Sequence, residues 1–365
     1  MNSEVKINGR QFTILVIMNT LGSAIIMGPA IVASYGRENS WISVLIASMI
    51  GILVVLMYIQ IFKLDRNKDI FQLLEKLLGK WLGKFISFLF VLYVFYVVIG
   101  NLRAMGDFII THILVETPLE VMILLILITC LIGVRMGIEV ISRTSEVFFP
   151  YVAIAIFLLI AMVFKEAEVT KIQPILQTNI GGMLAGAVPL IGYPFFELII
   201  LLSLMKDVNK PEKAKKAFII GVTIGGFLLT SITLMCLLVL GVDLTVRNTY
   251  PTYVLGKKIS IADFVERVEV IVAIIWFFTI FFKIMTIFYV LSVGVSRILN
   301  LKSYKTVTVP IAYFIIVFAV VLAPNVVYTS QFITGTWIPL SATFGLVLPI
   351  ILLVVGLLKE NKTRS

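Results

Sequence analysis

Two stretches, LGSAIIMGP at residues 21–29 and LIGYPFFE at residues 190–197, place glycine and proline inside otherwise apolar runs. Both residue types cost helix stability, so the matched interruptions predict two helices that are broken near their centres. Broken helices in corresponding positions of two halves are typical of a small-solute site near the bilayer midplane. We expect the breaks at Gly22–Pro29 and Gly192–Pro194.

The composition around these stretches is that of a membrane protein. Of 365 residues, 60% are hydrophobic and 14% are charged, whereas soluble domains average about 25% charged residues. Apolar runs of about 20 residues, the length that crosses a bilayer, recur along the chain. We expect one all-α membrane domain over residues 1–365 with ten transmembrane helices, at Phe12–Ser34, Trp41–Phe62, Leu82–Ile113, Leu119–Val134, Val147–Phe164, Gly182–Met205, Ala217–Leu240, Phe264–Ile298, Val307–Ala323 and Trp337–Leu358.

Ten spans divide into five plus five, with repeats at about residues 12–164 and 182–358. An odd number of spans in each half inserts the second half inverted, and the breaks then fall in the first helix of each half, spans one and six. This predicts the inverted-repeat design of the amino acid–polyamine–cation permeases and their sodium-coupled, LeuT-like relatives.

Basic residues orient this arrangement. With a cytoplasmic N-terminus, 21 Lys and Arg residues fall on the side of the termini and 6 in the opposite loops, which predicts that both termini are cytoplasmic. The same placement explains the net charge of +10 without nucleic acid. The amphipathic segment Asp69–Lys84 is expected along the cytoplasmic face, and Tyr250–Asp263 is expected to be an external loop that can cap a cavity.

Several functional classes are excluded by what the sequence lacks. Cys130 and Cys236 lie inside apolar spans and are interpreted as buried small hydrophobes. His112 is the single histidine and no zinc-ligand spacing occurs, so neither a metal nor a cofactor is expected. No nucleophile–base–acid set and no phosphate-binding glycine loop is present, so the protein is not expected to be an enzyme. Lys6 and Arg10 precede an apolar run without a cleavage site, which indicates a retained first helix.

The first break is the first candidate site. At Gly22, Ser23 and Ala24 the freed backbone groups must face a cavity or a ligand, because they cannot face lipid. The N-terminus of the following half-helix carries partial positive charge and suits a carboxylate. The alternative is a packing kink filled by neighbouring side chains.

Two charges lie deep in apolar spans. Glu197 follows the second break, and a carboxylate at this depth must be partnered, protonated or functional; it can hold a ligand amine, carry a proton or anchor a neighbouring helix. Lys283 lies roughly 21 Å from the cytoplasmic end of span eight, too far to snorkel. One hypothesis is that its ammonium replaces the cation that bridges helices one and eight in sodium-coupled relatives. The other is a structural pair with Glu146 or Glu197.

Other polar residues have simpler interpretations. Arg103 and Asp107, four apart in span three, predict a local ion pair. On the same span a stripe of Tyr93, Val97, Gly100 and Ala104, with Asn101 adjacent, fits either close helix approach or a cavity. The charge triplets at Glu266–Glu269 and at Glu139, Arg143 and Glu146 predict networks that fix helix ends, with gating as the alternative.

With these residues in view, the chain resembles the B subunit of the GerA-type spore germinant receptors, the spore permease family, from about Asn8 to Leu358. The motifs that carry the resemblance are NTLG at residues 19–22 with Pro29, Trp41, LGKWLG at residues 78–83, RAM at residues 103–105, Thr117-Pro118, Gly137-x-Glu139-x-x-x-Arg143-x-x-Glu146-x-x-x-Pro150, Pro194-Phe195-x-Glu197, and Phe264-x-Glu266-Arg267-x-Glu269 followed by Trp276.

The resemblance implies a nutrient-sensing subunit, a germinant receptor in the spore inner membrane, that binds an amino acid or similar nutrient. It implies two partners, an A subunit with a membrane domain and a C subunit that is a lipoprotein. The alternative function is a proton- or cation-coupled amino acid permease, and a nucleoside remains an alternative ligand. Mapped onto this chain, and with the residues of the second break added, the ligand site comprises Gly22, Ser23, Ala24, Val97, Ile191, Gly192, Tyr193, Glu197 and Lys283.

Overall fold

The computed structural model describes residues 6–175, 180–258, 268–322, 332 and 335–364. The regular structure in these ranges is helical, apart from one isolated bridge between Ile7 and Val208. The α-helices are α1 (Gly9–Leu21), α2 (Ala24–Gly36), α3 (Ser40–Leu64), α4 (Ile70–Leu78), α5 (Lys80–His112), α6 (Leu119–Met136), α7 (Ile138–Val163), α8 (Ile180–Leu190), α9 (Pro211–Arg247), α10 (Pro251–Lys257), α11 (Glu269–Ile298), α12 (Lys305–Val321), α14 (Trp337–Ala342) and α15 (Leu348–Arg364). Short 3₁₀ or π segments are η1 (Arg37–Asn39), η2 (Phe164–Glu166), η3 (Val169–Ile172), η4 (Ile191–Phe195), η5 (Phe196–Asp207) and η6 (Thr343–Val347).

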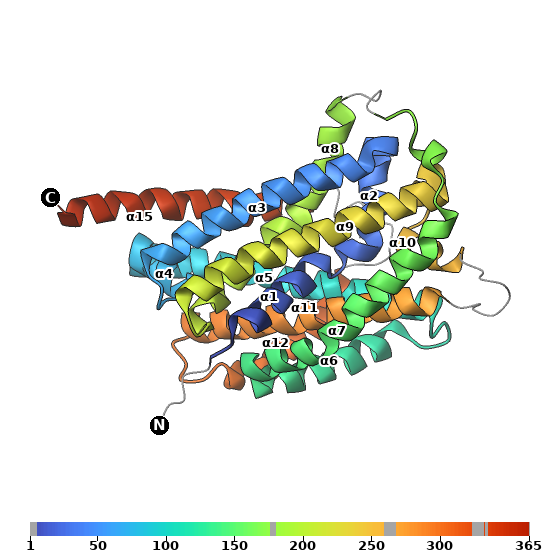
Figure 1. The fold of residues 1–365 in the computed structure, drawn as a ribbon. Helices are drawn as coiled ribbons and strands as arrows, with labels where there is room; N and C mark the ends of the chain where they lie inside the picture. Colours follow the sequence, from blue (N-terminus) through green and yellow to red (C-terminus); the bar gives the residue numbers. More distant parts are fainter. Residues whose placement is uncertain (1–5, 176–179, 259–267, 323–331, 333–334, 365) are drawn as a thin grey trace.

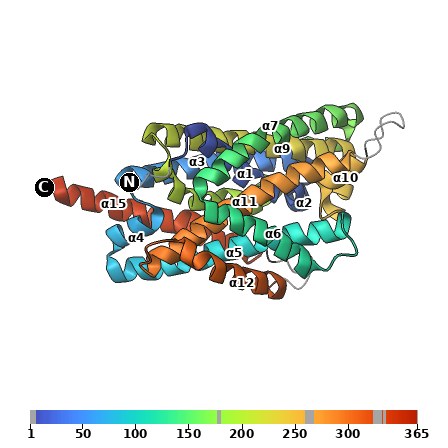
Figure 2. The ribbon, with the colours of Figure 1, turned by 90° about the horizontal axis from the view of Figure 1, so that it is seen from below.

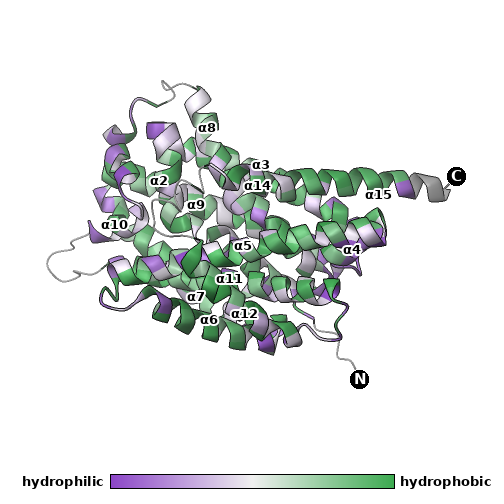
Figure 3. Cartoon of the chain, turned by 180° about the vertical axis from the view of Figure 1, so that it is seen from behind, coloured by the Kyte–Doolittle hydropathy of each residue, from purple (hydrophilic) through white to green (hydrophobic). Residues whose placement is uncertain are grey.

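The long helices lie side by side along one axis of the molecule (Figures 1 and 2). α1 and α11 lie in the interior, where α1 packs against α9, α11 and α7. α1 begins and α15 ends on the same side of the bundle as α4, and we call this the terminal side. Hydrophobic residues cover the middle of the bundle and hydrophilic ones gather at its two ends (Figure 3). An apolar outer band of this kind is what a lipid bilayer requires.

Eight helical segments of the described residues are long and apolar enough to cross a membrane. One of them, Ala24–Leu64, runs through α2, η1 and α3, while α12 is a shorter apolar helix. The chain is therefore an all-helical, multi-pass membrane protein, as expected. The count of ten spans stays a prediction: α1 has only 13 residues because the break ends it, and a full crossing takes about 20.

Both predicted breaks are present, but the first is shorter than expected. Helix α1 ends at Leu21 and α2 begins at Ala24, so only Gly22 and Ser23 interrupt the helix, and Gly28–Pro29 lies inside α2. Proline removes the N–H that would bond the carbonyl four residues earlier. Thr252 of α10 supplies a donor instead, because its hydroxyl donates to the Ile25 carbonyl at 2.7 Å.

The second break extends over the whole of η4. There Tyr193 has non-helical dihedral angles (φ −143°, ψ 103°), and the chain continues as the 3₁₀ segment η5 instead of returning to an α-helix. α8 has 11 residues and η5 has 12. The predicted span Gly182–Met205 is thus two short helices on either side of an unwound centre.

The segment Asp69–Lys84 is not one amphipathic helix. Its first part forms α4, whose N-terminus is closed by a capping box between Asp69 and Gln72. Gly79, at φ +87°, then ends α4, and α5 begins directly at Lys80. A backbone with positive φ is open to glycine and strained for other residues. The same device starts α7 at Ile138 rather than at the predicted Val147, because Gly137 has φ +104°.

Three predicted features lie partly outside the described residues. The start of the eighth span at Phe264, with Glu266 and Arg267, is not described, and neither is the end of the ninth span at Ala323. Of the expected external loop Tyr250–Asp263, the first part is helix α10, which packs against α11, α9 and α2.

Three glycines, Gly221, Gly225 and Gly226, lie on the face that α9 turns to α1 and α3, which permits close approach. A Cβ atom added at Gly225 would lie 2.7 Å from the Cβ and Cγ2 of Thr20, and one added at Gly226 would lie 2.7 Å from the Cβ of Ser48. These are atoms near the backbone, so a larger residue requires the helices to move apart.

We therefore expect Gly225→Ala to destabilise the folded protein by roughly 1–3 kcal/mol, the usual cost of overpacking. Thermal unfolding of the purified protein in detergent measures this as a lowered midpoint. Gly100→Ala is the matched control, because a Cβ there meets no atom within 4 Å. Equal midpoints for the two variants would contradict the close α1–α9 contact.

Candidate functional site

The first break lies directly against Lys283 of α11. Gly22 ends α1 with φ +22° and donates its N–H to the Met18 carbonyl at 2.9 Å. A Cβ atom at this position would overlap the Cδ of Lys283 and lie 3.4 Å from its Nζ. Gly22 is thus required twice, for its backbone conformation and for the space that the lysine occupies.

Lys283 pairs with Glu197, which settles its structural partner in favour of Glu197 over Glu146. Its Nζ lies 2.7 Å from Glu197 Oε2, and the two side chains are 1% and 4% exposed. The ammonium also lies over the ring of Tyr193, 5.1 Å from its centre, a cation–π arrangement. One lysine therefore joins α11, the break between α1 and α2, and the unwound η4–η5 segment.

Glu146, the other predicted partner of Lys283, instead contacts the start of α1. It accepts a hydrogen bond from Gln11 Nε2 at 3.0 Å and lies 3.4 Å from Arg10 Nε, so it ties α7 to the start of α1. Arg143 pairs with Glu139 within α7. These contacts are those of a network that fixes helix ends.

Helix α5 contacts the same break from the other side through a polar pair. Ser23 donates its hydroxyl to Asn101 Oδ1 at 2.8 Å, and Asn101 Nδ2 donates to the Val97 carbonyl at 2.8 Å. Both side chains are buried. The hydroxyl and amide of this pair place polar atoms where the helix has lost its own hydrogen bonds.

The second break is held by α3 and by the segment before α15. Tyr58 of α3 donates its hydroxyl to the Gly345 carbonyl at 2.6 Å and lies 3.3 Å from the Phe196 carbonyl. Gly192 faces α14, because a Cβ there would lie 2.9 Å from Ser341 Oγ. The unwound backbone at residues 191–196 is thus packed against protein and not against lipid.

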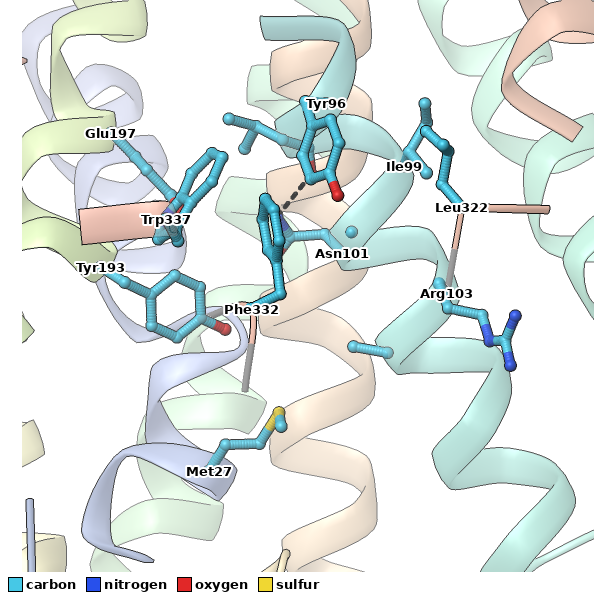
Figure 4. A pocket seen from close by; sticks show the side chains of 13 residues that line it. Met27, Tyr96, Ile99, Asn101, Arg103, Tyr193, Glu197, Leu322, Phe332 and Trp337 are labelled. Carbon is cyan, nitrogen blue, oxygen red and sulfur yellow. Dashed lines mark hydrogen bonds between the residues drawn. The ribbon is translucent and has the colours of Figure 1, made fainter. Parts of the chain in front are cut away.

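A cavity lies between the two breaks and α5 (Figure 4). Its volume, measured as space open to the centre of a water-sized sphere, is about 60 Å³, room for a few water-sized groups. Tyr193, Glu197 and Trp337 lie on one side of it and Tyr96 and Asn101 on the other. The lining residues are Met27, Tyr96, Val97, Ile99, Gly100, Asn101, Arg103, Ala104, Tyr193, Glu197, Leu322, Phe332 and Trp337.

Three of the nine predicted site residues line this cavity: Val97, Tyr193 and Glu197. The other six do not appear in its lining: Gly22, Ser23, Ala24, Ile191, Gly192 and Lys283. Gly22, Ser23 and Lys283 are nevertheless joined to it, through Glu197, Tyr193 and Asn101, and all three are buried behind the lining.

Sequence reasoning did not assign the aromatic part of the lining. Tyr96 stacks on Phe332 at 4.9 Å and on Trp337 at 5.9 Å between ring centres. Trp337 in turn stacks on Tyr93 at 5.4 Å. Aromatic residues are common in membrane helices, so these carried no distinguishing signal. Gly100, Asn101 and Ala104 did carry one, as members of or neighbours to the small-residue stripe on span three.

Arg103 and Asp107 form the predicted ion pair, but Arg103 also contacts another helix. Its Nε lies 2.8 Å from Asp107 Oδ1, and its Nη1 donates to the carbonyls of Ala319 and Val320 at 3.3 Å. These carbonyls belong to the last turn of α12, where a helix carries partial negative charge. Arg103 lines the cavity yet points away from Tyr193 (Figure 4).

The described residues offer little for catalysis. No group of three His, Cys, Asp or Glu side chains among them is placed to hold a metal ion. The buried polar groups form ion pairs and helix contacts around an apolar and aromatic cavity. This arrangement suits recognition of a small molecule.

Solved structures with the same fold are transporters. MhsT, in a complex with L-phenylalanine, aligns with a TM-score of 0.67 at 14% identity, over 98% of this chain and 99% of that chain. A sodium-coupled sialic acid symporter, in a substrate-bound outward-open state, aligns with a TM-score of 0.65 at 14% identity, over 92% of this chain and 78% of that chain. The fold is therefore LeuT-like.

Curated relatives are spore germination proteins. Spore germination protein KB of Bacillus subtilis is 26% identical over 99% of this chain and 97% of its own length. Spore germination protein B2 of the same organism is 24% identical over 88% of each chain. Spore germination protein XB of Bacillus anthracis is 22% identical over 96% of this chain and 98% of its own length.

The family model described as "Spore germination protein" matches residues 6–327. Because that range is most of the chain, the protein belongs to this spore permease family of spore germination proteins, which are not enzymes.

Proposed function

We propose that this protein is the nutrient-sensing B subunit of a spore germination receptor. The observation that carries the proposal is the cavity between two broken helices, with a buried ion pair at its lining, in a chain whose relatives are spore germination proteins. A ligand changes a protein only through unequal affinity for two of its states. A cavity that joins four chain segments gives a ligand contacts that depend on how those segments are arranged.

In this proposal the chain lies in the spore inner membrane with both termini in the cytoplasm. It has ten spans, in two inverted repeats over residues 12–164 and 182–358, with spans one and six broken. Its partners are an A subunit with a membrane domain and a lipoprotein C subunit. The excess of Lys and Arg on the terminal side supports the orientation.

The ligand is an amino acid or a similarly small nutrient. The N-terminus of α2, at Gly22, Ser23 and Ala24 behind the cavity lining, favours its carboxylate. Val97 and Tyr193 of the lining contact its body, and Ile191 and Gly192 form the unwound backbone next to Tyr193. The ion pair of Glu197 and Lys283 fixes the position of η5 relative to the first break. Met27 and the stacked rings of Tyr96, Phe332 and Trp337 add an apolar and aromatic surface that suits an apolar side chain.

The alternative is a proton- or cation-coupled amino acid permease. The observation that favours it is the likeness to sodium-coupled transporters together with the position of Lys283, whose ammonium lies at the contact between the first break and α11. In this version the lysine replaces the coupling cation. Both versions use the same cavity, so a functional assay must separate them.

Deletion of the gene tests the sensing proposal. We expect spores of the deletion strain to lose germination in one class of single nutrients, and membrane vesicles that carry the protein to show little uptake of that nutrient. Strong uptake combined with normal germination of the deletion strain would replace the sensor by the permease.

The roles of Lys283 and Glu197 are separated by a single and a double substitution. Lys283→Met leaves the Glu197 carboxylate buried without its cation, at a cost of about 3–5 kcal/mol, so we expect much less protein in spore membranes. Adding Glu197→Gln removes that charge, and we expect protein level to recover while the nutrient response stays lost. A wild-type response from Lys283→Met at a normal protein level would refute a functional lysine.

Recognition by the N-terminus of α2 predicts a requirement for the ligand's carboxylate. For the amino acid that gives the strongest response in a germination panel, the matching amine without the carboxylate is expected to fail at equal and at tenfold higher concentration. The amide, which keeps the shape but not the charge, is the control for size. An amine that triggers germination as well as the amino acid contradicts this binding mode.

A further inference from the structure

A second hollow lies on the terminal side of the bundle, between the starts of α1 and α9 and the first turns of α7. It is larger and more open than the midplane cavity, with about 490 Å³ open to the centre of a water-sized sphere. Its lining includes three cationic side chains, those of Arg10, Lys213 and Lys216. Its position at the ends of helices places it at the level of lipid headgroups.

The described residues do not balance the charge in this pocket. Glu146 is the one carboxylate among the described residues of the lining, and it is already engaged by Arg10 and Gln11. Glu212, the acid in the first turn of α9, lies 2.8 Å from Lys215 and 3.7 Å from Arg66. Among the described residues no ion pair involves Lys213 or Lys216, so the pocket keeps a surplus of positive charge.

The placement of these lysines works against the helix that carries them. Lys213 lies in the first turn of α9, where the helix macrodipole disfavours cations, and Lys216 follows in the second turn. Gly9 brings the start of α1 close to them, since a Cβ there would lie 3.2 Å from the Cβ of Lys213. An anion bound between the two helix starts relieves both the repulsion and the unfavourable dipole.

The pocket continues into an apolar stripe on α9. Lys216, Ile220, Ile224 and Phe227 follow one another at helical spacing on one face. The last three are 38%, 37% and 68% exposed, and Ile220 itself lines the pocket. From Lys216 to Phe227 the helix rises roughly 16 Å, close to the roughly 15 Å thickness of one hydrocarbon leaflet. A soluble anion makes no contact with this apolar stripe, whereas the acyl chain of a lipid can pack along it.

We propose that this pocket is a binding site for an anionic phospholipid, with the phosphate between Arg10, Lys213 and Lys216 and an acyl chain along the α9 stripe. Basic pockets between membrane helices bind anionic headgroups in this way. The site is separate from the midplane cavity and does not depend on which nutrient, if any, binds there. It joins α9 and α1, so the lipid stabilises the inner half of the first broken helix.

Lipid binding to the purified full-length protein tests the site. In native mass spectrometry with phosphatidylglycerol titrated against phosphatidylcholine, we expect selective retention of the anionic lipid. The double variant Lys213→Gln/Lys216→Gln removes two contacts worth about fivefold in affinity each. We expect its affinity for phosphatidylglycerol to fall roughly 30-fold or more, and Lys213→Arg/Lys216→Arg to retain binding.

The matched control is Lys80→Gln/Lys302→Gln, which removes the same charge from the terminal side outside the pocket. An equal loss in this control would overturn the proposal, because binding would then reflect diffuse charge. Complete displacement of phosphatidylglycerol by millimolar inorganic phosphate would also overturn the proposal, because it would show that the site binds soluble anions. Loss of binding in Lys213→Gln/Lys216→Gln but not in the control, with unchanged thermal unfolding in detergent, supports the proposal.

Discussion

Backbone polar groups inside a bilayer must be satisfied by the protein itself, and this constraint organises the molecule around its two breaks. Each interruption of a helix frees carbonyl and N–H groups, and each has a side chain from another helix beside it. Asn101 of α5 and Lys283 of α11 lie at Gly22–Ser23, and Thr252 of α10 bonds the carbonyl freed by Pro29. Tyr58 of α3 lies 3.3 Å from the Phe196 carbonyl at the second break. The helices that surround the site are therefore also the ones that make the breaks tolerable.

The buried pair of Lys283 and Glu197 belongs to the same logic. A charge pair in a low-dielectric interior adds little net stability by itself, but removing one member is costly because the other is left uncompensated. The pair thus constrains which arrangements of α11 and η5 are permitted. The cavity lies against η5 and close to α11, so the proposed ligand would act on the two segments that this pair holds together.

Features that depend on local sequence patterns could be predicted, whereas features that depend on contacts between distant segments could not. The apolar runs and the two Gly–Pro interruptions identified the class of fold and the location of both breaks, because their physical cost is local. The extent of the first break was not predictable, since the Ile25 carbonyl, which Pro29 cannot bond, accepts a hydrogen bond from Thr252, 227 residues away from Ile25. Gly79 divides a segment that was expected to be one amphipathic stretch, and Gly137 lets α7 begin at Ile138, nine residues before the start that the apolar pattern predicts. The aromatic lining from Tyr96, Phe332 and Trp337 is assembled from distant segments, and nothing local distinguishes these rings from lipid-facing ones.

The fit of Lys283 against Gly22 has a consequence for substitutions at either position. The lysine's aliphatic stem occupies the space in which any other residue at position 22 would carry its Cβ. The two positions, 261 residues apart in the sequence, are therefore coupled by packing. An exchange of the glycine requires the side chain at position 283 to move or to be shorter, and even with a shorter side chain there the positive φ of position 22 still limits which residues fit.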